Sequence, residues 1–460
     1  MKRTAAGMSR RDSRKTCRGR RARWRGVYRA ILASAMLALG ARAGAAAETT
    51  NAPVPRTELA PVPEPVQLEM AMRALRVRQE RISAKAISYL WDQRMDRTTG
   101  RIGKVQARYV HALCWLALVS DGSADAPRYR ERVEKVIASL RQPIEELADK
   151  AGAESKIFVG TSRETLAFET HAVVALAYEQ LAAADLGNPA QSELFARGAE
   201  SAITYIMDFR KRGRNYDTAG GWPVNAAPYN LNRPDRRCTV WQLLLMKAHT
   251  YAGGKVDSTA MEEGPNFIFA AQRVAPEMTD SLREAEKTYK EWIPRIRRGE
   301  PVTEQVRDRL NDFYEYRRQL EDAGGFGLDT IGIITPGATA VGLYTMGLFR
   351  FEDAARYRAA VQAYVRMPLA WDAQRSFMTQ FFATRGLLMY SERFQTLDFC
   401  TYMNRLLTLM EQKQDADGSF PLGSYGVEEL NEMERVYTTA MCVLIVNCNR
   451  GNLLFDRPAF

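Results

Sequence analysis

The chain has 460 residues, of which 46% are hydrophobic and 10% are aromatic, so it can bury at least one substantial core. Its net charge of +11 is concentrated at the start, because residues 1–47 hold 13 of the 65 basic residues and one of the 54 acidic residues. The remaining 52 basic and 53 acidic side chains nearly cancel, which argues against a nucleic-acid-binding surface.

Residues 1–47 are typical of an export signal. Many arginines precede the apolar stretch "AILASAMLALG" (30–40), and the small residues of "ARAGAAAE" that follow suit cleavage near Ala47. The apolar stretch is too short to span a bilayer as a helix, so no membrane span is expected in the mature chain. We predict a periplasmic or secreted protein, with an uncleaved N-terminal membrane anchor as the alternative. Residues 48–66 contain five prolines and predict a stiff linker.

Helical periodicity dominates from residue 67 onward. Six segments are apolar nearly all round, as expected for helices buried on both sides: 109–120, 168–182, 238–252, 335–349, 377–390 and 436–448. More amphipathic segments lie between them, at 84–95, 128–142, 193–212, 357–367 and 400–413. This alternation predicts an all-α fold over residues 67–455, an (α/α)6 toroid of inner and outer helix rings. A linear solenoid is the main alternative.

Residues 254–318 break this period. They are highly charged and predict an inserted helical segment, interrupted at Pro294 and Gly299. Such a segment is either a solvated helical hairpin or a lid or partner surface.

Four loops share one pattern: "QRMDRTTGRIG" (93–103), "NYDTAGGWPV" (215–224), "QLEDAGGFGLD" (319–329) and "QKQDADGSFPLG" (412–423). Each contains an acid or amide, then glycine, then an aromatic residue or isoleucine. We expect the glycine to end an outer helix in a left-handed conformation and the apolar side chain to fill the gap between hairpins.

The string "QDADGSF" resembles the QxxxGxW pattern of the prenyltransferase and squalene oxidase repeat, with Phe420 in the tryptophan position. The stretch "GGWPV…DRRCTVWQLL" (220–244) is similar to the same unit. The resemblance covers roughly residues 75–450 and implies the toroid shared by terpenoid cyclases, squalene cyclase C-terminal domains and protein prenyltransferases. Because the repeat is a structural device, it predicts the fold and not the reaction.

The catalytic signatures of those relatives are missing. The chain contains neither DxDD, which protonates an alkene in cyclases, nor DDxxD, which holds magnesium on a diphosphate. Asp398 and Cys400 have the spacing of a prenyltransferase zinc pair, but no histidine follows them. We therefore predict no metal site and no cofactor. The five cysteines after the leader are expected to be buried free thiols, since their number is odd and no CxxC occurs.

If the inner helices run parallel, their N-termini gather at one mouth, where helix dipoles favour an anion. His111, His171 and Asp235 are the candidate catalytic residues there, although helix capping explains each of them as well. The candidate ligand-binding residues are Arg236, Arg237, Trp241 and Tyr437.

Three functions remain open. In the first, an exported repeat protein without cyclase or prenyltransferase chemistry binds a ligand, of small-molecule or glycan type, or a partner at the central cavity. In the second, the toroid is a polysaccharide-active lyase or hydrolase, which requires an acid pair or an Arg/Tyr/His set in the cavity. The third is an atypical terpenoid-modifying enzyme. We favour the first as the hypothesis to test.

Overall fold

Helices alternate between an inner and an outer ring throughout the described part of the chain. The computed structural model describes residues 65–102, 108–151, 167–184, 188–210, 219–226, 233–327, 333–369, 371, 374–421 and 428–456. The predicted signal peptide and nearly all of the predicted linker lie outside these residues. Within them, no helix is long and apolar enough to cross a membrane.

The inner ring is built from six helices: α3 (Arg108–Asp121), α5 (Ala167–Ala183), α7 (Arg236–Tyr251), α11 (Pro336–Leu348), α13 (Gln374–Phe394) and α15 (Glu428–Val446). Each contacts the next in this order, and α15 returns to contact α3, so the ring is closed. The apolar residues that cover these helices all round are buried, because each helix touches an inner neighbour on either side and an outer helix behind it.

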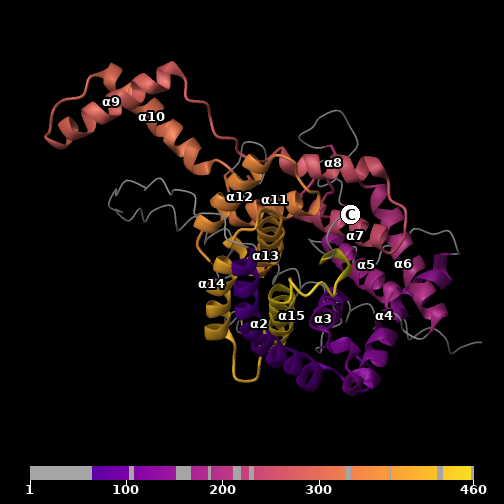
Figure 1. Cartoon of the computed structure of the whole chain (residues 1–460). Coiled ribbons are helices and arrows are strands. Elements are labelled where there is room, and N and C mark those ends of the chain that lie inside the picture. Colours follow the sequence, from indigo (N-terminus) through magenta and orange to yellow (C-terminus); the bar gives the residue numbers. More distant parts are fainter. Residues whose placement is uncertain are drawn as a thin grey trace, which may run out of the picture. The chain divides into compact units, whose positions relative to one another are not determined.

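The outer ring also has six helices: α2 (Pro65–Ser88), α4 (Arg130–Ala151), α6 (Pro189–Met207), α8 (Ser258–Phe269), α12 (Ala354–Arg366) and α14 (Asp398–Lys413). A π-helical turn, η2 (Tyr89–Arg94), continues α2, and short 3-10 turns η3 (Ser123–Asp125), η4 (Pro127–Tyr129) and η5 (Leu454–Asp456) complete the elements. Figure 1 shows the helices following one another around the ring. The predicted (α/α)6 toroid is confirmed, and contact between α14 and α2 closes it where a linear solenoid would have free ends.

The four repeated loops form the same joint. Gly418 has φ +92°, and a Cβ added there would lie 2.2 Å from the carbonyl oxygen of Lys85 in α2. Only glycine combines this left-handed conformation with such a close approach to the next outer helix. Gly100, Gly220 and Gly324 also have positive φ and lie equally close to the backbone of α4, α8 and α12. The loop glycines therefore seat each joint on the following outer helix.

The apolar residue of each joint is buried and held by an inner helix. The side chains of Trp222, Phe326 and Phe420 are fully buried, and Ile102 nearly so. The backbone amide of each donates a hydrogen bond to a side chain of the next inner helix: Ile102 to His111 Nδ1 (3.3 Å), Trp222 to Thr239 Oγ1 (3.0 Å), Phe326 to Thr339 Oγ1 (3.0 Å) and Phe420 to Thr439 Oγ1 (3.1 Å). The joint thus links three helices and leaves no buried amide unsatisfied at this point.

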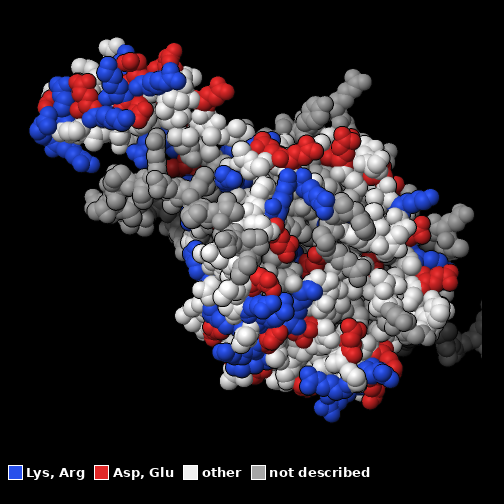
Figure 2. All heavy atoms as spheres, viewed as in Figure 1, with Lys and Arg blue, Asp and Glu red and all other residues white. Residues whose placement is uncertain are grey.

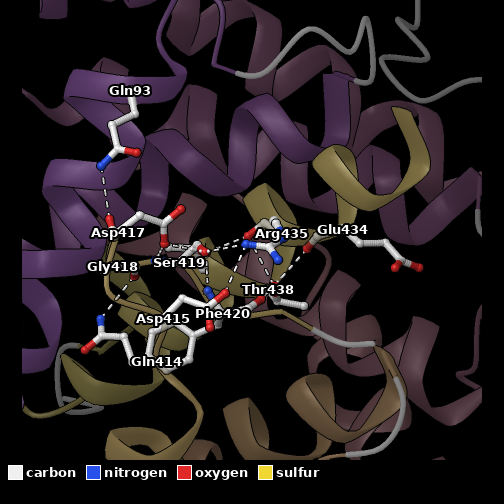
Figure 3. A network of polar contacts seen from close by, with 11 residues as sticks. Gln93, Gln414, Asp415, Asp417, Gly418, Ser419, Phe420, Glu434, Arg435 and Thr438 are labelled. Carbon is white, nitrogen blue, oxygen red and sulfur yellow. Dashed lines mark hydrogen bonds and ion pairs between the residues drawn. The ribbon is translucent and has the colours of Figure 1, made fainter. Parts of the chain in front are cut away.

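Polar contacts across the ring closure extend the last joint (Figure 3). The Gln414 side-chain amide donates to the carbonyl oxygens of Ile82 (3.0 Å) and Gly418 (3.1 Å). Arg435 of α15 donates to Asp415 Oδ2 at 3.0 Å. Hydrogen bonds within the protein therefore hold the loop in shape, and its aspartates serve the joint.

A helical hairpin interrupts the ring between α8 and α11. It consists of α9 (Asp280–Arg297) and α10 (Glu304–Asp322), which share a small core around Ala285, Phe313 and Tyr316. Backbone hydrogen bonds of Arg273 with Gly324 and Gly325 tie its two ends together. The predicted insertion began at residue 254, but residues 258–269 belong to the outer ring as α8. The predicted break at Gly299 ends α9, whereas Pro294 lies within that helix.

The five cysteines in the described residues, Cys114, Cys238, Cys400, Cys442 and Cys448, are free and buried. This confirms the prediction of buried thiols. Burial raises the pKa of each of them, and that of Cys400 to about 11, so they are inert as nucleophiles.

The joint makes a prediction about glycine replacement. Gly418→Ala should lower the free energy of unfolding by about 2–4 kcal/mol, because the new Cβ combines a left-handed conformation with a clash against the backbone of Lys85. Gly253→Ala is the matched control, since Gly253 has φ +90° but no atom within 4 Å of the added Cβ. It should cost only about 1 kcal/mol. Urea denaturation of both variants measures the difference, and equal losses would contradict the steric role of the joint.

Candidate functional site

Four polar side chains from four inner helices meet at one end of the inner ring. Arg237 Nε lies 3.1 Å from Glu169 Oε2, and the Tyr109 hydroxyl donates to Glu169 Oε1 at 3.3 Å. The rings of Tyr109 and Tyr437 are stacked with centroids 6.1 Å apart. Since Tyr109, Glu169 and Arg237 lie in the first turns of α3, α5 and α7, these helices present their N-terminal ends together. We call these four residues the Arg237 cluster.

The electrostatics of the Arg237 cluster follow from burial. The Glu169 side chain is only 3% exposed, whereas that of Arg237 is 24% exposed, so the ion pair lies at the edge of the protein interior. Glu169 raises the pKa of Arg237, with Asp235 adding to the effect. Burial raises the pKa values of Tyr109 and Tyr437, which are therefore neutral hydroxyls at pH 7. The cluster offers one cation, one carboxylate and two phenols.

The guanidinium of Arg237 is only partly used by the protein. Its contact with Glu169 runs through Nε, and no acceptor among the described residues takes a hydrogen bond from Nη1 or Nη2. The two Nη groups of a guanidinium form a fork that matches a carboxylate. The arrangement can therefore hold an anionic group from solution while Glu169 fixes the arginine in place.

Asp235 and Arg236, which directly precede Arg237, make contacts outside the Arg237 cluster. Asp235 is the N-cap of α7, where its Oδ1 accepts from the backbone amide of Cys238 at 2.8 Å. The Arg236 side chain lies over the ring of Phe267 in α8, with 4.9 Å between the guanidinium carbon and the ring centroid. The adjacent arginines thus diverge, and only Arg237 joins the cluster.

Trp241 fills the ring interior one turn further along α7. It stacks on Phe381 of α13 at 5.2 Å between ring centroids and meets Phe382 edge-on at 5.3 Å. Because α7 and α13 are not neighbours in the ring, these side chains reach across its centre. Trp241 is 1% exposed. It therefore packs beneath the Arg237 cluster.

The two candidate histidines belong to the framework. His111 accepts the Ile102 amide at Nδ1, and its Nε2 lies 2.5 Å from Ser139 Oγ in α4. His171 Nε2 donates to the carbonyl oxygen of Ala202 in α6 at 2.9 Å. Burial lowers the pKa of each to about 4, so both are neutral at pH 7. The structure places them against outer elements and does not bring them into the Arg237 cluster.

Sequence reasoning missed Tyr109 and Glu169, although a signal for Tyr109 exists. Tyr109 lies two residues before the joint residue His111, and Arg237 and Tyr437 precede Thr239 and Thr439 by the same interval. Counted from the joint residues, this position is Tyr109 in α3, Arg237 in α7, Gly337 in α11 and Tyr437 in α15. It identifies three of the four side chains that meet at the ring end, whereas Glu169 lies on α5, for which no joint is described.

The fold and this cluster define an all-α toroid with a polar site at one end of its inner ring, beside the N-termini of α3, α5 and α7. On the face shown in Figure 2, side chains of both signs are interspersed over the described surface. No known protein family matches the sequence, and no curated protein matches it. The resemblance to the prenyltransferase and squalene oxidase repeat thus rests on the loop motifs alone.

One solved structure with detectable similarity comes from Salmonella enterica subsp. enterica serovar Paratyphi A str. ATCC 9150 and is described as a "possible member of GH105 family". It is 14% identical, and the match covers 86% of this chain and 98% of that chain with a TM-score of 0.29. A similarity this low carries no inference about chemistry. The toroid assignment rests on the ring of helix contacts described above.

The buried histidines predict acid sensitivity. The pKa of His111 is about 4 in the folded protein and about 6.5 in an unfolded chain, so the unfolded state binds the proton more tightly. Its contribution to stability is complete above pH 6.5 and is lost as the pH falls toward 4. His111→Thr installs the residue that the other joints use and should reduce the stability difference between pH 7 and pH 4.5 by about 2 kcal/mol.

Urea denaturation at both pH values tests this expectation. Thr339→Val is the control, because it removes a joint hydroxyl without removing a titrating group. It should lower stability by about 1–3 kcal/mol equally at both pH values. An unchanged pH dependence in His111→Thr would contradict the assignment of a buried neutral imidazole.

Proposed function

We propose that the protein is an exported toroid that binds an acidic glycan through the Arg237 cluster. The observation that carries the proposal is the guanidinium of Arg237, which Glu169 holds at Nε while its two Nη groups have no acceptor among the described residues. A uronate carboxylate is the matching ligand group, because a bidentate arginine–carboxylate pair combines charge with planar geometry.

The other members of the cluster suit a sugar. The hydroxyls of Tyr109 and Tyr437 are neutral. The Tyr109 hydroxyl donates its proton to Glu169 and can accept a hydrogen bond from a sugar hydroxyl, whereas the Tyr437 hydroxyl can donate or accept. Glu169 offsets the charge of Arg237, so the site holds one acidic unit without accumulating positive charge. A single fork surrounded by phenols favours a polyhydroxylated carboxylate over a densely charged phosphate.

The remaining positions of the ring end carry a glycine and a buried aromatic residue. Gly337 and Phe377 occupy the places that correspond to Arg237 and Tyr437 on α11 and α13. Glycine contributes no side chain there, and an added Cβ would come no closer than 3.4 Å to its nearest neighbour, Thr379. Phe377 packs edge-on against Trp371 at 4.8 Å between centroids. The polar Arg237 cluster therefore faces no further charged side chain from these two positions of α11 and α13.

Export belongs to the same proposal. The arginine-rich start, the apolar stretch 30–40 and the small residues near Ala47 support secretion to the periplasm or beyond, where extracellular polysaccharides occur. Prenyl-transfer and cyclase chemistry are not proposed, since the sequence lacks the acidic motifs that they need.

A lyase is the second candidate, favoured by the hydrogen bond from Tyr109 to Glu169 beside Arg237. In β-elimination, a base removes the proton next to a uronate carboxylate, the glycosidic C–O bond breaks, and the leaving oxygen takes up a proton. Arg237 would neutralise the carboxylate, and a tyrosine would move the proton. The high pKa of Tyr109 makes it a weak base at pH 7, so we place binding first.

Binding should depend on Arg237. Isothermal titration with oligogalacturonate should detect binding by the wild-type protein, whereas a neutral oligosaccharide of the same length should bind at least tenfold more weakly. Arg237→Gln should weaken oligogalacturonate binding about 10–100-fold, and Arg237→Lys should recover part of the loss. Tyr109→Phe, which keeps the stacked ring, should weaken binding about 3–10-fold.

Arg366→Gln is the matched control, because Arg366 is an exposed arginine of α12 outside the cluster. It should bind like the wild type. Melting temperatures confirm that each variant is folded before titration. Equal binding by Arg237→Gln and the wild type would refute the proposed site.

The lyase candidate predicts a different signal. Incubation of the wild-type protein with polygalacturonate should release unsaturated products that absorb in the ultraviolet, and Tyr109→Phe should abolish their release if Tyr109 transfers the proton. Binding without ultraviolet-absorbing products supports the binding function and contradicts the lyase.

A further inference from the structure

The hairpin of α9 and α10 has no role in the closed ring or in the proposed function. The two helices pack on each other, and neither of them packs extensively on a helix of the ring. The Gly324 amide donates to the carbonyl oxygen of Arg273 at 2.8 Å, and the Arg273 amide donates to that of Gly325 at 2.9 Å. The chain therefore leaves the ring and returns to it at one place. We call residues 280–322 the arm.

One face of each arm helix is used within the arm. Apolar residues recur at alternating intervals of three and four along α9, at Leu282, Ala285, Tyr289, Trp292 and Ile296. The same spacing on α10 selects Val306, Leu310, Phe313, Arg317 and Leu320. The rings of Tyr289 and Phe313 lie 4.8 Å apart between centroids, and Arg317 Nη1 donates to the Tyr289 hydroxyl at 3.2 Å. The arm is therefore an antiparallel helix pair joined along one narrow seam.

The arm and its flanks also expose apolar side chains. Six large hydrophobic residues of the described chain are exposed, and four of them lie here: Val274, Tyr314, Leu320 and Ile333. Tyr314 meets Tyr289 edge-on at 5.5 Å between centroids but remains 47% exposed. Leu320 is 38% exposed although it belongs to the seam. Because two helices bury one seam only, while four helices around a common core bury more of each helix, a second helix pair can cover this surface.

The charge of the arm changes sign along its length. The tip, residues 294–311, holds five basic and three acidic side chains, a net charge of +2. The base, residues 280–286 and 315–322, holds three basic and six acidic side chains, a net charge of −3. In Figure 2, side chains of both signs cover the visible surface of the arm. The arm is therefore nearly neutral as a whole but polarised from base to tip.

Several of these charges are not used within the protein. Arg295 and Arg298 of the tip pair with Glu300. The other three arginines of the tip and two acids of the base are exposed and form no ion pair with a described residue: Arg297, Arg307, Arg309, Glu284 and Asp322. The unpaired charges have the sign of the part of the arm in which they lie, so they are available to a partner of opposite polarity.

This polarity favours a second copy of the chain as the partner. Two arms packed antiparallel place the basic tip of each on the acidic base of the other, whereas parallel arms oppose like charges. A two-fold axis at the middle of the arm makes both contacts at once. A partner of a single charge sign matches only one half of the arm.

The dimensions of the arm suit a weak dimer. Helix α9 has 18 residues and is about 27 Å long. Two packed helices are about 20 Å wide. Two such faces bury roughly 1,000 Å² in total, at the low end for specific interfaces, so a dissociation constant of about 1–10 μM is expected.

We propose that the arm is a dimerisation element, in which α9 and α10 of two copies pack antiparallel as a four-helix bundle. The exposed apolar side chains lie between the two helix pairs, and the tip and base charges set the direction. This inference does not rest on the glycan site, because the arm contributes no residue to the Arg237 cluster.

The test compares charge reversals by sedimentation velocity of the whole protein at low ionic strength. The wild type should be largely dimeric at about 50 μM. The tip variant Arg297→Glu/Arg307→Glu/Arg309→Glu and the base variant Glu284→Lys/Asp322→Lys should each weaken dimerisation about tenfold or more. An equal mixture of the two variants should form heterodimers, because the acidic tip of one then meets the basic base of the other.

Combining all five substitutions in one chain decides the direction of packing. The antiparallel dimer should be restored, since tip and base are again opposite in sign, whereas a parallel dimer would remain repelled. Melting temperatures check that each variant is folded. Tyr314→Glu should also weaken dimerisation about tenfold by placing a charge in the apolar interface. A monomeric wild type at about 50 μM, a dimer that ignores both charge reversals, or no recovery in the combined variant would overturn the proposal.

Discussion

The hydrogen bond from the amide of a buried loop residue to a side chain of the next inner helix is the contact on which the ring depends. A loop that enters the interior brings polar backbone groups with it, and each must find a partner. Thr239, Thr339, Thr439 and His111 meet this need in four loops. Because the same bond fixes both the depth of the loop and the position of the inner helix, repetition of the joint brings successive helix pairs around to a closed ring.

This device also explains why a site can form where it does. The joint residue of α3, α7, α11 and α15 is constrained, but the residue two places earlier is not needed for the joint. Helices α3, α5, α7 and α15 contribute tyrosine, glutamate, arginine and tyrosine, and the four side chains meet at one end of the ring as the Arg237 cluster. The helix termini add a favourable field for an anion at this end. The repeated joint thus fixes where each inner helix lies, while the residue types next to the joint differ from helix to helix.

The charged side chains at the two ends of the inner ring differ in their burial and in how they are paired. At the N-terminal end, Arg237 remains 24% exposed, so its unused Nη groups can meet a ligand from solution. At the other end, Arg385 and Asp456 are almost completely buried and their charges are matched by a bidentate pair. Trp241 and Phe381 pack between these levels and keep the two environments apart. The separation allows a ligand to bind at one end without disturbing the anchored turn at the other.

The amino-acid sequence by itself determined the architecture of this protein, including the alternation of helices, the four joints and the place of Phe420 in the last one. These features are local, since periodicity, a glycine and an aromatic residue within a few positions suffice to define them. Helical periodicity did not reveal α8, because this short helix contains Pro265 and adjoins the hairpin. The predicted insertion therefore began too early, at residue 254. Only the tertiary structure separated Arg237 from Arg236, assigned His111 and His171 to the framework, and brought in Glu169 and Tyr109. Adjacent residues on a helix point about 100° apart, and partners from helices some 70 residues distant in the chain meet only when the ring closes.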